Sequence, residues 1–367
     1  GPSAGLLDAR DPNIEHQREL EHWLDLQATL ALRPERAVAL LQRAADPEAA
    51  LHLHGSRVSR TASERKARLS LLRRLEVRAL PLVSPAYPPG LARLVDAAPL
   101  LLVQGRADVS ILGRTCVAIV GARAATAYGL NLARQLGTAL AGAGAVVVSG
   151  LARGIDAAAH RGALDAGGVT VAVQACGPDR VYPPEHRRLS ERIAETGLLL
   201  TEMPPGTPPR APYFPLRNRL ISGLSQAVVV VEARTRSGSL VTARHALDQG
   251  VEVMAVPGPV GVPPSEGPNR LLLDGARPCL GGADLLEALG LEANEGDATP
   301  TSSAEPLAPE AQRVLEALAY EPASRDELAQ RLELAAGALA APLLELELAG
   351  RVVHDRDGKL RVLSKRG

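Results

Sequence analysis

Residues 116–160 read CVAIVGARAATAYGLNLARQLGTALAGAGAVVVSGLARGIDAAAH, and this stretch decides the fold. Residues 117–120 and 146–148 are short runs rich in β-branched side chains, typical of buried parallel strands. An Ala- and Leu-rich segment of helical length separates them. Similar apolar runs follow at residues 169–173, 198–201, 227–231 and 251–256. The sequence therefore predicts an α/β core with a Rossmann-like, doubly wound and mostly parallel sheet.

The segments on either side of this core have different patterns. Apolar residues recur at helical spacing between residues 14 and 80, which predicts an all-helical N-terminal domain, SAM-like or helix-hairpin-helix-like. The C-terminal pattern of three helices and a hairpin predicts a winged helix. The expected parts are a cloning remnant at 1–5, domains at 6–84, 85–290 and 307–367, and a linker at 291–306.

The composition limits the possible functions. Basic and acidic residues number 41 each, so a nucleic-acid ligand would need a local basic patch. Cys116, Cys176 and Cys279 are dispersed without ligand spacing, which predicts no metal site and a reducing compartment, the cytoplasm. No apolar run is long enough for a membrane span, so no membrane contact is expected.

Glycine, serine and arginine follow the predicted strands. Because the carboxyl ends of parallel strands meet at one edge, and backbone amides at helix N-termini bind anions, these residues predict an anion-binding rim. Only one glycine of the dinucleotide fingerprint is present, which disfavours NAD. The candidate residues are Gly121, Arg123, Tyr128, Ser149, Gly150, Arg153, Gly154, Ser237, Gly238 and Ser239.

The only phenylalanine of the chain, Phe214, precedes Arg217, Asn218 and Arg219. Two guanidiniums and an amide beside a ring could clamp phosphates and stack a planar group. A proline-rich loop with ordinary surface arginines is the alternative. We expect the two arginines to grip phosphates and Phe214 to anchor them on the core.

The sequence offers no machinery for bond cleavage. It contains no Walker lysine, no carboxylate pair at metal spacing and no activated nucleophile, which predicts a binding protein without cofactor rather than an enzyme. Asp156 and His160, one turn apart, are expected to form a pair on a helix surface. A nucleotide-binding enzyme of the nucleoside monophosphate hydrolase kind, built on Asp156, Glu202 or Glu232, and a scaffold that binds only a small anion are the alternatives.

Six ordered blocks resemble the DNA-processing protein A (DprA/Smf) family. They are residues 117–123 with 128–129, 149–156 with 160, 177 with 181–183, 214–219, 237–239 and 257–258. The resemblance implies a core that binds single-stranded DNA, protects it and loads the recombinase RecA during natural transformation, without catalysis. It also implies a homodimer formed through the core, with a RecA contact that overlaps the dimer surface. Single-strand-binding protein is a further candidate partner.

By motif match, the resemblance assigns phosphate binding to Arg123 and places Arg153, Arg217, Asn218 and Arg219 in the same region. Family members carry a basic residue after the Tyr-Pro block, and Arg187 is the substitute here.

Two further expectations come from the residues themselves. The third helix of the C-terminal domain falls in residues 332–350, which contain no Arg, Lys, Asn or Gln, so this domain is expected to contact proteins rather than to read DNA. Residues 251–273 are the candidate dimer surface.

Overall fold

The computed structural model describes residues 5–44, 46–55, 61–292, 308–348, 351–354 and 359–362. The chain divides into two compact units, residues 1–123 with 133–294, and residues 124–132 with 295–367. Most of the predicted linker and the predicted hairpin tip, Asp357 and Gly358, lie outside the described residues. Within the described ranges, no helix combines the length and the apolar character needed to cross a bilayer.

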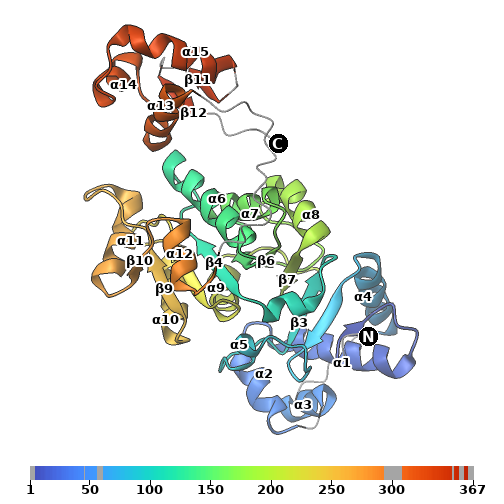
Figure 1. Cartoon of the computed structure of the whole chain (residues 1–367). Coiled ribbons are helices and arrows are strands. Elements are labelled where there is room, and N and C mark those ends of the chain that lie inside the picture. Colours follow the sequence, from blue (N-terminus) through green and yellow to red (C-terminus); the bar gives the residue numbers. More distant parts are fainter. Residues whose placement is uncertain are drawn as a thin grey trace. The chain divides into compact units, whose positions relative to one another are not determined.

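A ten-stranded mixed sheet runs through the first unit in the order β1-β2-β3-β7-β6-β5-β4-β8-β9-β10 (Figure 1). Strands β4 to β10 are parallel to one another, while β1, β2 and β3 extend the sheet beyond β7 in antiparallel pairing. The six predicted strands are present as β4 to β9, so the predicted doubly wound sheet is confirmed. The strands are β1 (Leu7–Asp8), β2 (Arg78–Pro81), β3 (Leu100–Gln104), β4 (Cys116–Val120), β5 (Val146–Ser149), β6 (Thr170–Gln174), β7 (Leu198–Thr201), β8 (Ala227–Val230), β9 (Glu252–Ala255) and β10 (Arg277–Pro278).

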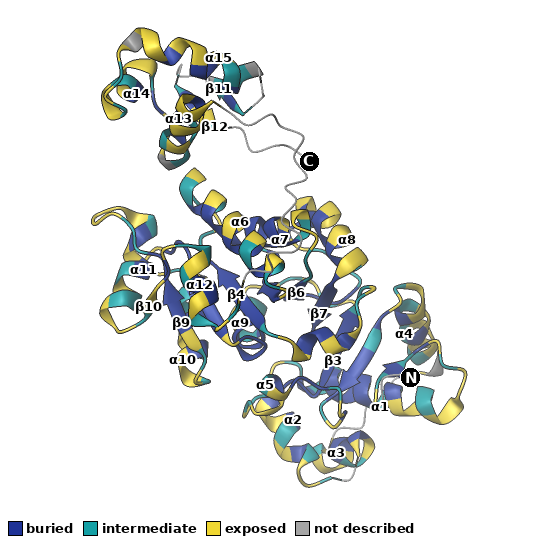
Figure 2. Cartoon of the chain, viewed as in Figure 1, coloured by how far each residue is buried: buried dark blue, intermediate teal, exposed yellow. Residues whose placement is uncertain are grey.

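Helices cover both faces of this sheet, and Figure 2 shows their buried sides turned inward. On β7, Leu200 enters a core shared with α9 and α10, whereas Leu199 packs with Leu189 and Ile193 of α8. The helices are α1 (Ile14–Leu30), α2 (Pro34–Leu41), α3 (Pro47–His54), α4 (Ala62–Arg74), α5 (Pro89–Ala92), α6 (Ala127–Gly142), α7 (Ile155–Asp165), α8 (Arg187–Thr196), α9 (Tyr213–Gly223), α10 (Gly238–Asp248), α11 (Pro263–Leu273) and α12 (Gly282–Ala288), with short 3₁₀ helices η1 (Val109–Gly113) and η2 (Pro184–His186).

The N-terminal helices pack against the antiparallel extension of the sheet. Trp23 of α1 is 1% exposed and shares a core with Leu100 and Leu102 of β3. Gln27, also on α1, donates its side-chain N–H to the carbonyls of Leu100 (3.2 Å) and Glu202 (2.9 Å). Strand β2 lies in a region where the sequence predicted helices alone. It was not predicted because four residues are too few to show an alternating pattern. The boundary between residues 84 and 85 stays a prediction.

The second unit has the predicted arrangement of three helices and a hairpin. Its elements are α13 (Pro309–Tyr320), α14 (Arg325–Arg331), η3 (Ala336–Leu339), α15 (Ala340–Leu348), β11 (Val352–His354) and β12 (Leu360–Val362). The predicted capping box is present, since Ser324 accepts from the backbone of Glu327 and the Glu327 side chain accepts from the backbone of Ser324. Strands β11 and β12 pair in antiparallel fashion.

Helices α6 and α7 touch through glycines. A Cβ atom added at Gly162 would lie 2.0 Å from the carbonyl oxygen of Arg134, and one added at Gly137 would lie 2.4 Å from that of Ala159. Both neighbours are backbone atoms, which cannot rotate away. The spacing of these two helices therefore depends on residues without side chains.

We predict that Gly162→Ala lowers the free energy of unfolding by about 2 kcal/mol, because the added methyl group forces α6 and α7 apart. Gly142→Ala, at the end of α6, is the matched control, since an added Cβ meets nothing within 4 Å there. It should stabilise by up to about 0.5 kcal/mol. Urea unfolding measures both changes, and an unchanged midpoint for Gly162→Ala would contradict the close packing.

Candidate nucleic-acid interface

The strand order of the sheet reverses next to β4, which has β5 on one side and β8 on the other. The loops after β4 and β8 lead to helices on opposite faces, and open α/β sheets bind ligands at such a point. Here the two loops are joined, because the Ala122 N–H donates to the Glu232 carbonyl at 2.7 Å. They form one continuous surface at the carboxyl edge of the parallel strands.

The loop between β5 and α7 packs tightly on the loop after β4. Gly154 has φ +74°, and a Cβ there would lie 2.1 Å from the Ala122 carbonyl oxygen. A Cβ at Gly121 would lie 2.5 Å from Cγ1 of Ile155, whose N–H donates to Ala122 at 3.2 Å. The two glycines thus let the loops touch. The Ile155 amide serves this contact and the Ala122 amide serves the contact with the loop after β8, so neither of these amides of the predicted anion-binding rim is free to bind an anion.

The carboxylate of Asp156, rather than an external anion, accepts the backbone amides of the loop between β5 and α7. Its Oδ2 accepts the N–H groups of Gly150 (3.1 Å) and Ala152 (3.4 Å). Burial raises the pKa of this carboxyl, and the nearby Arg217 opposes the rise. The side chain is only 6% exposed.

His160 is fully buried as well, with its Nδ1 2.7 Å from the hydroxyl of Thr170, and burial lowers its pKa to about 3. The prediction of a surface pair between Asp156 and His160 is therefore wrong, because both side chains point into the core and bind different groups. Helical spacing alone does not distinguish a buried helix face from a solvated one.

Arg123, Phe214 and Tyr182 form a cluster at the carboxyl edge. The Arg123 guanidinium carbon lies 5.2 Å from the centre of the Phe214 ring, within cation–π distance. The ring of Tyr182 lies 5.4 Å from that of Phe214, tilted by 56°. Arg123 is exposed, and no described residue forms a hydrogen bond or ion pair with it. Its charge is available to a ligand.

Arg217 lies behind the same ring and points inward. It is 4% exposed, its Nη1 donates to the carbonyls of Gly150 (2.9 Å) and Val173, and its Nε donates to Asn218 Oδ1 (3.2 Å). Burial lowers its pKa to about 10. The prediction that Arg217 grips phosphate is not supported by this arrangement, because its donors hold the ends of β5 and β6 together.

Arg219 is also buried, and all five of its N–H groups have acceptors. Its Nε and Nη2 bind Asp96, its Nη1 and Nη2 bind both oxygens of Glu202 at 2.9 and 2.7 Å, and its Nη1 reaches the Leu216 carbonyl. No donor remains for a phosphate. The predicted role of Arg219 is therefore replaced by an internal ion pair that joins α9 to β7.

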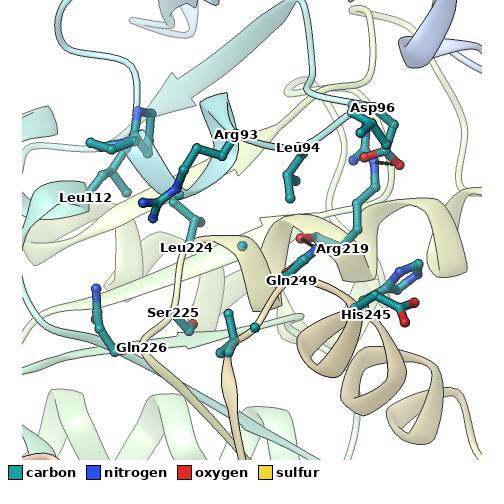
Figure 3. A pocket seen from close by; sticks show the side chains of 18 of the residues that line it. Arg93, Leu94, Asp96, Leu112, Arg219, Leu224, Ser225, Gln226, His245 and Gln249 are labelled. Carbon is teal, nitrogen blue, oxygen red and sulfur yellow. Dashed lines mark hydrogen bonds and ion pairs between the residues drawn. The ribbon is translucent and has the colours of Figure 1, made fainter.

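The other side of this ion pair faces a cavity of about 790 Å³ (Figure 3). Arg219 and Asp96 line it together with Leu112, Gln226 and Val251, which precede β4, β8 and β9. The cavity therefore lies at the amino edge of the parallel strands, away from Arg123. Its position agrees with a structural rather than a ligand-binding role for Arg219.

Several other predicted site residues have internal partners. Ser149 is fully buried and donates its hydroxyl to Ile119, Asn218 donates to the Gly238 carbonyl at 3.1 Å, and the hydroxyls of Ser237 and Ser239 lie 2.7 Å apart at the start of α10. The side chains of these residues hold the loops at the carboxyl edge together through hydrogen bonds within the protein. Gly238 is exposed at the same turn.

The remaining predicted residues lie at the surface or in the second unit. Arg153 is exposed and forms an ion pair with Glu185 of η2. Arg187 is exposed in the first turn of α8. Tyr128 is in the first turn of α6, within the segment that groups with the second unit.

Three residues of this edge were left out of the predicted set of site residues. Tyr182 was not among the predicted site residues, although it is one of only seven aromatic residues and stands beside Pro183. Arg234 and Arg236 are exposed in the loop after β8, opposite the Arg123 loop across the point of strand reversal. Their position directly after an apolar strand was the available signal.

Models of two protein families match the chain. The model of the family DNA recombination-mediator protein A matches residues 78–290, and that of the DprA winged helix domain matches residues 298–358. The chain belongs to the DNA recombination-mediator protein A family. The DprA/Smf resemblance and the winged-helix prediction are confirmed.

Relatives of this family share much of the chain. Protein Smf of Escherichia coli is 40% identical over 291 residues, covering 77% of each chain. DNA processing protein A of Streptococcus pneumoniae has a TM-score of 0.63 at 33% identity, over 72% of this chain and 95% of that one. The protein from Helicobacter pylori, whose structure concerns a single-stranded DNA binding mode, has a TM-score of 0.51 at 32% identity, over 55% and 92%.

We predict that Arg219→Met destabilises the protein by about 3–5 kcal/mol at neutral pH, because Glu202 loses its partner in the core. Burial already raises the pKa of Glu202. In the variant its pKa rises further above the unfolded value, so stability falls as pH increases between the two values, and the loss should be smaller in mildly acidic buffer.

Urea unfolding at several pH values measures this effect. The double variant Arg219→Met with Glu202→Met is the control and should recover part of the stability, because it leaves no unpaired carboxylate at the buried position 202, while Asp96, which also loses Arg219, is 31% exposed. A stable Arg219→Met protein that has lost its affinity for DNA would instead support the prediction that Arg219 binds phosphate.

Proposed function

We propose that this family member binds single-stranded DNA, without sequence preference, at the carboxyl edge of its parallel strands. The exposed, unpaired guanidinium of Arg123 beside Phe214 and Tyr182 carries the proposal. Cations that hold phosphates, next to rings on which bases stack, are what such binding requires. Tyr182 is 38% exposed, so it offers a stacking surface, while Phe214 holds Arg123 in place.

The surrounding charges support this assignment. Arg153 stands on the loop after β5, Arg187 opens α8, and Arg234 and Arg236 stand on the loop after β8, all of them exposed. The chain as a whole has no formal net charge, so the attraction for phosphates has to be local. Affinity should fall steeply with salt.

Within the family's role as recombination mediator, we propose that the protein protects incoming single strands and loads RecA on them in the cytoplasm during natural transformation, with single-strand-binding protein as a candidate partner. We also propose a homodimer formed through the edge of the sheet at β9 and β10. Val260, Leu273 and Leu280 are 96%, 79% and 71% exposed there, which is unusual for large apolar side chains. The RecA contact would overlap this surface.

The winged-helix domain is proposed to contact proteins. Its α15 carries Glu345 and Glu347, and no Arg or Lys lies in this helix. A recognition helix with this composition would repel phosphates.

The proposed function does not include catalysis or a cofactor. Asp156 and Glu202 are buried and bound to loop amides and to Arg219, and Glu232 is 5% exposed and also engaged. The three carboxylates on which the nucleotide-hydrolase alternative depends are thus not exposed as general bases. Release of free base from nucleoside monophosphates by the purified protein would revive that alternative.

We predict that Arg123→Glu lowers affinity for oligothymidine more than about tenfold at low salt and reduces the slope of log K against log salt by about one. Fluorescence anisotropy over a salt series measures both. Arg244→Glu, at an exposed and unpaired arginine of α10, is the matched control and should bind normally. If Arg123→Glu bound oligothymidine with wild-type affinity, Arg123 would not be part of the DNA interface.

We predict that Glu185→Gln raises affinity for oligothymidine about two- to fivefold at low salt, because it frees Arg153 from a competing carboxylate. The gain should disappear at high salt and in the background Arg153→Ala. An equal gain in both backgrounds would mean that Glu185 acts on DNA directly and not through Arg153.

A further inference from the structure

Three helices on one face of the sheet meet at a single carboxylate. Asp165 at the end of α7 accepts from Arg192 of α8 at 2.8 Å on one oxygen and from Arg134 of α6 on the other. Figure 1 shows α7 between α6 and α8. The glycine contact at Gly162 brings the α6 backbone close enough for this arrangement. Asp165 therefore holds two guanidiniums at fixed positions.

A third arginine adds an unbalanced charge to this group. Arg161 lies one turn before Asp165 on α7 and is exposed, and no described residue forms a hydrogen bond or ion pair with it. Its pKa is lowered, first by desolvation and next by the positive charge of Arg134. An arginine remains charged at neutral pH even so. Three guanidiniums thus share one carboxylate, which leaves the group strongly cationic.

Exposed arginines outnumber exposed carboxylates on these three helices. Five exposed arginines stand against three exposed carboxylates on α6, α7 and α8, namely Arg134, Arg161, Arg187, Arg188 and Arg192 against Asp165, Glu191 and Glu195. On α10, which packs on the opposite face, exposed Arg244 is matched by exposed Asp248. Helix α10 therefore shows no such excess of exposed positive charge.

This charged face is continuous with the candidate interface. Arg187 and Arg188 open α8 directly after η2, whose Glu185 pairs with Arg153. From there Arg192 lies one turn further along α8, and Arg161 lies about 9 Å from the start of α7. A row of separated cations suits a ligand with repeating negative charges better than one small anion. Helices α7 and α8 contain no aromatic residue, so this row can hold a backbone but cannot stack bases.

We propose that the face formed by α7, α8 and Arg134 of α6 is a second binding surface for the phosphates of the same single strand, which continues along it after leaving the Arg123 cluster. The proposal rests on the proposed function, since it extends that DNA path. The phosphate nearest Asp165 would lie between Arg161 and the two arginines that Asp165 holds, and contacts along the helices would be independent of base sequence.

The test compares two lengths of oligothymidine, of about 6 and about 30 nucleotides. Arg161→Glu should leave affinity for the short strand unchanged, lower that for the long strand about three- to tenfold at low salt, and make its salt slope shallower by about one. Arg161 has no hydrogen bond or ion pair to lose among the described residues, so folding should be retained; Arg161→Gln, which places no second carboxylate near Asp165, is a milder variant with the same readout. Arg244→Glu is the control on the opposite face.

The outcomes separate this proposal from the proposed function. Normal binding of both lengths by Arg161→Glu would overturn the second surface and leave the Arg123 site standing. Equal loss for both lengths would also overturn it, because Arg161 would then act on the first site or through the general field. Failure of the wild-type protein to bind either strand would overturn the proposed function itself.

Discussion

The buried ion pair between Arg219 and Glu202, with Asp96 beside it, joins three segments that are far apart in the chain. A guanidinium and a carboxylate are stable in a core only when every donor and acceptor is satisfied, and here all five donors of Arg219 are used. The pair fixes the position of α9 relative to β7 and to the segment before β3. Phe214 lies five residues earlier on the same rigid helix, about 8 Å along its axis. The ring against which Arg123 packs is thus held in place by an ion pair between its own helix and the residue that follows β7.

Arg217 supports the candidate interface through buried hydrogen bonds to the strand ends beneath it. Residues two apart on a helix point to different sides, so Arg217 turns toward the strand ends while Arg219 turns toward Glu202. By binding the carbonyls of Gly150 and Val173, Arg217 ties the ends of β5 and β6 to the helix that carries Phe214. Two of the arginines in the segment therefore have structural partners, and the charge that we propose for DNA binding belongs to Arg123 on another loop.

The sequence predicted the parallel strands and therefore the edge at which the candidate site is placed, because β-branched runs and glycine turns are local signals. It could not predict which arginines are buried. Arg123 and Arg217 look equivalent in sequence, and their difference depends on carbonyls and carboxylates brought near by the fold. Strand β2 was missed for a similar reason, since its conformation is set by pairing with β3. The antiparallel extension and the inward direction of Asp156 likewise arise from tertiary packing.

The carboxylate of Asp156 occupies the amides of its loop, the type of place where nucleotide-binding sheets of this kind hold a phosphate. A free mononucleotide arriving at this edge finds that cradle already filled and can use only scattered side-chain cations. A polymer can engage several of those cations at once, and the contacts reinforce one another through their high effective concentration. Under the proposed function, the chain's own carboxylate would thereby favour long polyanions over the abundant small nucleotides of a cell.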